Sequence, residues 1–179
     1  IKVLNTHWRV VELAGPTDYR LRRLETAPVY LTPLNDATHQ AIRRHFNELV
    51  GSHRASQALQ INQREIPTVA WNQGVAWFDF DVICQIPRSQ LDYVELARQF
   101  HSLLLSNLRC LDDERVDLAH RLMTLVDACY DRNVKLVISA EAEPERLYQG
   151  RELAFEFQRT ASRLTEMRST QYLARPHLV

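Results

Sequence analysis

Two arginines near the C-terminal end, Arg159 and Arg163, have a spacing that suggests chemistry. The surrounding apolar pattern predicts a helix, and residues four apart in a helix share a face. Two guanidinium groups on one face can bind a phosphate group through paired hydrogen bonds. The alternative is a solvated face on which Glu156 and Glu166 serve as ion-pair partners, worth roughly a few tenths of a kcal/mol each. From the residues alone, the solvated face is favoured.

Aromatic residues are concentrated in residues 71–80. Two strand-like segments, 66–71 and 75–80, flank a turn that contains Gly74, and glycine allows the positive φ that a hairpin turn requires. This pattern predicts a β-hairpin. Its aromatic side chains are candidates for docking a partner protein, with a place in the core as the alternative: Trp71, Trp77 and Phe78.

The glycines and lysines cannot build a phosphate-binding P-loop. That motif needs a lysine directly before Ser or Thr, and neither Lys2 nor Lys135 has one. The 4 glycines lie far apart. The segment 103–114 places Asp112 and Asp113 after an apolar run, as a Walker B strand would. These acids fall at a predicted helix start, however, where N-capping worth about 1 kcal/mol explains them.

Composition restricts the class of protein. The chain has 179 residues with 45% hydrophobic and 25% charged residues, which is typical of one globular domain. Its net charge is zero, which argues against nucleic-acid binding, and no apolar run is long enough for a membrane span. The 3 cysteines form no C-x-x-C pair, and His39 and His45 have the wrong spacing for a helical metal site. We therefore expect a reduced, intracellular protein with no metal site. Because the chain starts at Ile1 and not at Met, we also expect it to be a fragment.

The periodicities divide the chain into five parts. Residues 1–34 are rich in strand signals, 35–52 form a helix, and 57–83 form strands with the hairpin. Residues 89–140 alternate helix, strand, helix and strand, and 144–175 contain the C-terminal helices. The strands at 102–108 and 134–140 flank a long helix, which predicts a parallel βαβ unit with a right-handed crossover. The expected class is α/β.

Seven motifs in this order resemble the C-terminal half of the AFG-like ATPases. The resemblance covers nearly the whole chain, from about Leu4 to His177. The motifs are T-D-Y-R at 17–20, Y-L-x-P-L at 30–34, W-F-x-F-x-x-x-C at 77–84, P-R-S-x-x-D-Y at 87–93, V-K-L-V-I-S-A at 134–140, L-Y-Q-G at 147–150, and F-x-R-T-x-S-R-L-x-E-M at 157–167.

The resemblance implies the C-terminal portion of a P-loop ATPase domain of the AAA+ type, with a mixed or parallel sheet, flanking helices and the hairpin as an insertion. The Walker motifs of that family lie in its N-terminal half. ATP and Mg²⁺ would therefore be bound by the full-length protein, and this fragment alone would be inactive. The resemblance also favours a nucleotide-sensing role for Arg159 and Arg163, with Arg20 as a further candidate.

The resemblance also implies partners. Bacterial members of the family are tied to the division ring and its tubulin-like protein FtsZ, and mitochondrial members to protein quality control. We therefore expect FtsZ or another protein client, a homo-oligomer at full length, and a bacterial cytoplasmic location with recruitment to the division site. The alternative function is a non-catalytic module that docks a partner.

Overall fold

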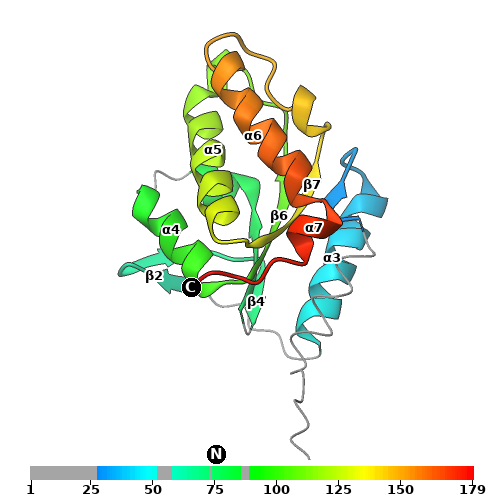
Figure 1. Ribbon diagram of the computed structural model, residues 1–179, viewed down its shortest axis with the longest axis vertical. Helices are drawn as coiled ribbons and strands as arrows, with labels where there is room; N and C mark the ends of the chain where they lie inside the picture. The colour runs from blue at the N-terminus through cyan, green and yellow to red at the C-terminus, as the bar shows by residue number, and fades with distance from the viewer. Residues whose placement is uncertain (1–27, 52–57, 73, 86–88) are drawn as a thin grey trace, which may run out of the picture.

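A five-stranded sheet lies at the centre of the structure, in the order β1-β7-β6-β5-β4 (Figure 1). The computed structural model describes residues 28–51, 58–72, 74–85 and 89–179. Four neighbouring strands run parallel, and β4 pairs with β5 in the antiparallel direction. The strands are β1 (Tyr30–Leu31), β4 (Ala70–Asn72), β5 (Val75–Asp79), β6 (Ser102–Leu108) and β7 (Lys135–Ala140). The expected mixed α/β sheet is confirmed.

The sheet has a hydrophobic core on each face because strand side chains alternate between the two sides. On one face, Phe78 and Leu105 pack with residues of α4 (Gln90–Gln99), α5 (Val116–Asp131) and α6 (Ala154–Met167). On the other face, Trp77 and Leu104 pack against α3 (Asp36–Val50). Figure 1 shows α4, α5 and α6 together on one side and α3 on the opposite side.

Side-chain hydrogen bonds cap the first turns of α3 and α4. At the start of α3, the Asn35 side chain accepts a hydrogen bond from the Thr38 amide at 3.0 Å, and Thr38 Oγ1 accepts one from the Asn35 amide. At the start of α4, the Asp92 carboxylate accepts from the Ser89 amide at 3.1 Å. These bonds satisfy amide groups that a helix leaves unpaired at its first turn. Gly51 ends α3 with a φ of 67°.

The predicted βαβ unit is present, and a second one precedes it. Helix α5 connects the parallel strands β6 and β7, and α4 connects the parallel strands β5 and β6. Short 3₁₀ segments at Asp113–Arg115 and Pro144–Arg146 lead into α5 and follow β7. The four-residue helix α7 (Thr170–Leu173) follows α6.

The predicted hairpin is present as β4 and β5, but the preceding segment differs from the expectation. The strand expected over 66–71 is divided at Pro67, which has no amide hydrogen for a ladder. Strand β3 (Arg64–Ile66) ends there and pairs with β2 (Leu59–Ile61) as a separate small hairpin. Strand β5 ends at Asp79, and a π-helix over Asp81–Gln85 replaces the expected continuation.

Two further expectations concern the strands before residue 28 and a membrane-spanning helix. The strands and the motif T-D-Y-R expected before residue 28 lie outside the described residues. Among the helices that the structure describes, none combines the length and apolar character needed to cross a membrane.

Candidate functional site

The arginine pair lies on the face of α6 that contacts α5, as the four-residue spacing predicts. Arg159 Nη2 and Arg163 Nη1 both donate to the carboxylate of Asp127, the first at 2.9 Å. One carboxylate therefore binds both guanidinium groups. The local partners considered from the sequence, Glu156 and Glu166, are replaced by an acid from the neighbouring helix. Helix packing decided this pairing, and the sequence of α6 carries no signal of it.

The two arginines differ in their freedom. The Arg163 side chain is 24% exposed, and its guanidinium carbon lies 4.7 Å from the centre of the Tyr130 ring. Such a cation–π contact adds to the ion pair. The Arg159 side chain is 63% exposed and has Asp127 as its ion-pair partner. Arg163 is thus fixed between α5 and α6, whereas Arg159 can reach an anionic group in solution.

A polar cluster extends the α5–α6 contact toward the C-terminal segment. The Tyr130 hydroxyl donates to Glu166 Oε2 at 2.6 Å, and Arg175 donates to Glu166 Oε1 at 2.9 Å. The hydrogen bond from Tyr130 is the main reason that the pKa of Glu166 lies below its usual value, with Arg175 adding to it. The Tyr130 ring also stacks on Tyr172 of α7. The cluster keeps the end of α6 in a fixed position relative to α5.

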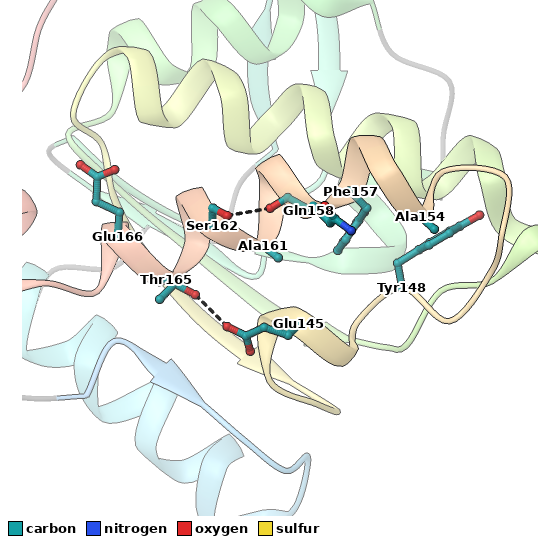
Figure 2. Close-up of a pocket in the computed structure, with 9 residues that line it drawn as sticks. All are labelled: Glu145, Tyr148, Ala154, Phe157, Gln158, Ala161, Ser162, Thr165 and Glu166. Atoms are coloured by element: carbon teal, nitrogen blue, oxygen red, sulfur yellow. Dashed lines mark hydrogen bonds between the residues drawn. The ribbon is translucent and has the colours of Figure 1, made fainter.

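A groove runs along the outer side of α6 (Figure 2), with a volume of about 830 Å³. Its α6 wall combines the apolar residues Ala154, Phe157 and Ala161 with polar side chains, and its other wall is formed by the segment after β7, which contributes Glu145 and Tyr148. Thr165 donates to Glu145 across the groove at 3.2 Å. Phe155 on the same helix is 82% exposed. Sequence reasoning missed this groove, because both walls depend on contacts between distant segments.

The L-Y-Q-G motif acquires a physical role at one end of this groove. The Asp113 carboxylate accepts hydrogen bonds from the Tyr148 hydroxyl at 2.6 Å and from the amides of Arg151 and Glu152. A side chain at position 150 would place its Cβ atom 2.1 Å from Asp113 Oδ1. Glycine at 150 therefore allows the carboxylate to approach the loop. Of the two acids expected to cap a helix, Asp112 does so by accepting from the Glu114 amide at 3.2 Å, and Asp113 binds this loop.

The aromatic docking candidates have different environments. Trp77 and Phe78 are buried on opposite faces of the sheet, and Trp77 Nε1 donates to Ser106 Oγ at 3.1 Å. Trp71 is half-buried and meets Phe100 edge to face. Trp77 and Phe78 are thus core residues in this fold, which was the alternative considered from the sequence. A direct contact with a partner would require them to leave the sheet.

The described residues hold no recognisable site for a nucleotide phosphate chain or a metal ion. No group of three or more potential metal ligands occurs in the part of the chain that the structure describes. The four glycines of the sequence are too dispersed for a phosphate-binding loop. The residues present therefore do not fit ATP with Mg²⁺ by themselves. The remaining sensing candidate, Arg20, lies outside the described residues.

Known proteins are similar in sequence to this chain over almost its whole length. The chain is 39% identical to the cell division protein ZapE of Escherichia coli over 99% of its own length and 48% of that protein. It is 29% identical to lactation elevated protein 1 homolog B of Danio rerio, over 96% of this chain and 41% of that protein. An uncharacterized protein of Schizosaccharomyces pombe is also 29% identical, over 98% and 46% of the two chains. The chain thus spans about half the length of these relatives. No solved structure matches it.

A protein-family model also matches almost the whole chain. The model described as AFG1-like ATPase matches residues 1–176. The match includes the motif of α6 that carries the arginine pair and the loop bound by Asp113. From its sequence, this chain belongs to the AFG1-like ATPase family.

Proposed function

We propose that this chain is the C-terminal half of an ATPase that hydrolyses ATP with Mg²⁺ when full length. One observation carries the proposal: the family model matches residues 1–176 of a chain that holds no P-loop of its own and spans about half of its relatives. The parallel βαβ units are compatible with a portion of a P-loop domain. The missing phosphate-binding residues would be supplied by the other half. This chain alone would hydrolyse no ATP.

Within that ATPase, we assign the nucleotide-sensing role to Arg159 in preference to Arg163. Arg163 is held by Asp127 and Tyr130, so moving it toward a phosphate group would break two contacts. Arg159 is exposed and could exchange Asp127 for a phosphate oxygen, from the same or a neighbouring subunit of a homo-oligomer. A positive charge placed against the phosphate stabilises the charge that develops during transfer.

The test measures ATP turnover of the intact protein and its Arg159→Ala variant. We expect turnover to fall about tenfold or more, since one lost charge contact in a phosphoryl-transfer site has effects of that order. Arg151→Ala is the matched control, because Arg151 is exposed and lies nearby in the sequence. Unchanged turnover and nucleotide affinity in Arg159→Ala would remove the sensing role and leave the ATPase assignment in place. Absence of ATP hydrolysis by the intact wild-type protein would overturn the assignment itself.

The biological setting we propose is bacterial cell division in the cytoplasm, with recruitment to the division site and FtsZ as the first client to test. The support is the similarity to the E. coli protein whose name places it in cell division. Co-sedimentation of the intact protein with FtsZ polymers measures this contact. If the protein stays in the supernatant, FtsZ is excluded as the client, and a client from protein quality control is the next to test.

The second candidate function is a partner-docking module without catalysis. The groove along α6 favours it, and Phe155, which is exposed on the same helix, offers an apolar side chain to a partner. The substitution Phe155→Ser distinguishes the two functions. Loss of client binding with normal ATP turnover supports docking through this groove, and normal client binding excludes it.

A further inference from the structure

A small polar pocket lies on the other face of the sheet, between α3 and the carboxyl ends of β5 and β6. Its volume is about 200 Å³. The strand side contributes the end residues Asp79, Ser106 and Asn107, and the α3 side contributes His39 and Arg43. Ligands of open α/β sheets bind outside the carboxyl ends of the strands. The pocket has that position, and it is separate from the arginine pair and the groove of α6.

The backbone of β6 is irregular at this point. The register between β6 and β7 shifts between Leu105 and Leu108, and Asn107 has a φ of 63°. An L-residue with positive φ is uncommon, and bulges occur often beside functional sites because they redirect a side chain. Here the side-chain amide of Asn107 donates to Asp79 Oδ2, and the backbone amide of Asn107 donates to Ser139 Oγ at 3.2 Å.

These contacts fix the Asp79 carboxylate without using all its capacity. Oδ1 accepts from the Asp81 amide at 3.0 Å, and Oδ2 accepts from Asn107. An ionised carboxylate has about four lone-pair positions, so it can accept further hydrogen bonds. Asp79 is half-exposed and lies at the pocket, where a positively charged or donating group of a ligand could approach it.

The opposite wall carries the complementary charge. His39 and Arg43 lie one helical turn apart on α3, and neither side chain has a hydrogen-bond or ion-pair partner among the described residues. The apolar part of the lining comes from Val69, which is 43% exposed, with the buried side chains of Ile42 and Trp77 behind it. The pocket thus offers a guanidinium group, a fixed carboxylate and an apolar surface in a space for a few heavy atoms.

We infer that this pocket binds a small zwitterion, an α-amino acid with a short aliphatic side chain. Its carboxylate pairs with Arg43, since guanidinium and carboxylate groups form paired hydrogen bonds. Its ammonium group donates to Asp79, and its side chain lies on the apolar part of the lining, which Val69 exposes. A purely anionic ligand would meet the Asp79 charge, and a purely cationic ligand would meet Arg43. The inference goes beyond the proposed ATPase function and does not depend on it.

The test is isothermal titration calorimetry of the intact protein with L-alanine and L-valine. We expect saturable binding that weakens about tenfold or more in Arg43→Gln, because a charge-assisted pair of hydrogen bonds is lost. The matched control is Arg44→Gln, since Arg44 is also exposed but lines a different pocket on the other side of α3. N-acetylalanine lacks the ammonium group and alaninamide lacks the carboxylate, so both should bind more weakly than alanine.

Three results would overturn the inference. They are no saturable heat with either amino acid, equal binding by Arg43→Gln and the wild type, and equal binding of the blocked compounds and alanine. Arg43 is exposed at the surface, so its substitution should leave the fold intact. ATP turnover of Arg43→Gln should equal that of the wild type, which separates this inference from the ATPase assignment.

Discussion

The ammonium group of Lys135 donates to the backbone carbonyl of Tyr172 at 3.2 Å in the interior of the protein. The same group donates to the carbonyls of Asn133, at 3.0 Å, and Arg175. Lys135 is 3% exposed, and its charge lies 5.4 Å from the centre of the Tyr172 ring. This lysine at the start of β7 therefore holds the C-terminal segment around α7 against the sheet.

Replacing Lys135 with methionine should destabilise the protein by about 2–4 kcal/mol. The variant keeps most of the side-chain volume but leaves buried carbonyl groups without their charged donor, which costs more than a lost hydrogen bond between neutral groups. Denaturant unfolding measures the change. Gln171→Met is the control, because Gln171 lies in α7 itself but is exposed. Equal unfolding free energies for both variants would show that the carbonyl contacts contribute little.

Arg163→Ala should also lower stability, by about 1–3 kcal/mol, because it removes a charged hydrogen bond to Asp127 and a contact with the Tyr130 ring. A double-mutant cycle with Asp127→Ala, followed by thermal unfolding, measures the part due to the pair. The cycle should give a clear coupling energy for Arg163, and a smaller one for the more exposed Arg159. Strictly additive single changes for Arg163 would mean that the pair does not stabilise the α5–α6 contact.

Local signals in the sequence predicted local structure well. Helix starts have a local code: Asn35 and Ser89 are residue types that favour an N-cap, and each is linked by hydrogen bonds to the residue three positions further on. The apolar run at 102–108 coincides with β6. The α/β class and the parallel βαβ unit followed from these elements.

The contacts that build the candidate sites join distant segments, and the sequence gives no spacing rule for them. Asp113 looked like a helix cap, and its carboxylate binds amides 38 residues away. Asp127 pairs with Arg163, which lies 36 residues further along the chain, and no helical spacing rule links positions so far apart. Trp77 is a docking candidate from its residue type alone, because the sequence does not show that α3 covers it in the core. Only the tertiary packing fixes these pairings.

The unfolding free energy should fall in acid, in part because of Asp92. Burial raises the pKa of this carboxyl group, but hydrogen bonds from Asn62 and Ser89 and the charge of Arg64 outweigh it and hold the pKa below its usual value. A lowered native pKa means that the stabilisation is complete above the unfolded-state pKa of about 4 and is lost as the pH falls through the native value.

The substitution Asp92→Asn isolates this contribution. The variant should be less stable than the wild type at neutral pH, and the difference should shrink as the pH drops below about 4. Denaturant unfolding at a series of pH values measures it, with Asp117→Asn as the control because the Asp117 side chain is 86% exposed. A difference that stays constant across the series would mean that Asp92 acts through its shape and not through its charge.

Gly150 lies in the loop before α6, where a side chain would collide with Asp113 and Tyr148. A Cβ atom there would lie 2.1 Å from Asp113 Oδ1 and 2.6 Å from the Tyr148 hydroxyl oxygen. Gly150→Ala should therefore displace the Asp113 carboxylate from its hydrogen bonds and lower the unfolding free energy, by less than a clash in a packed core because both colliding atoms are the ends of side chains. Gln149→Ala is the control at the neighbouring position. The cost of Gly150→Ala should be smaller when Asp113 is already alanine, because one of the two colliding side chains is then gone. If the cost is the same in both backgrounds, the close approach of Asp113 is not what requires glycine in this loop.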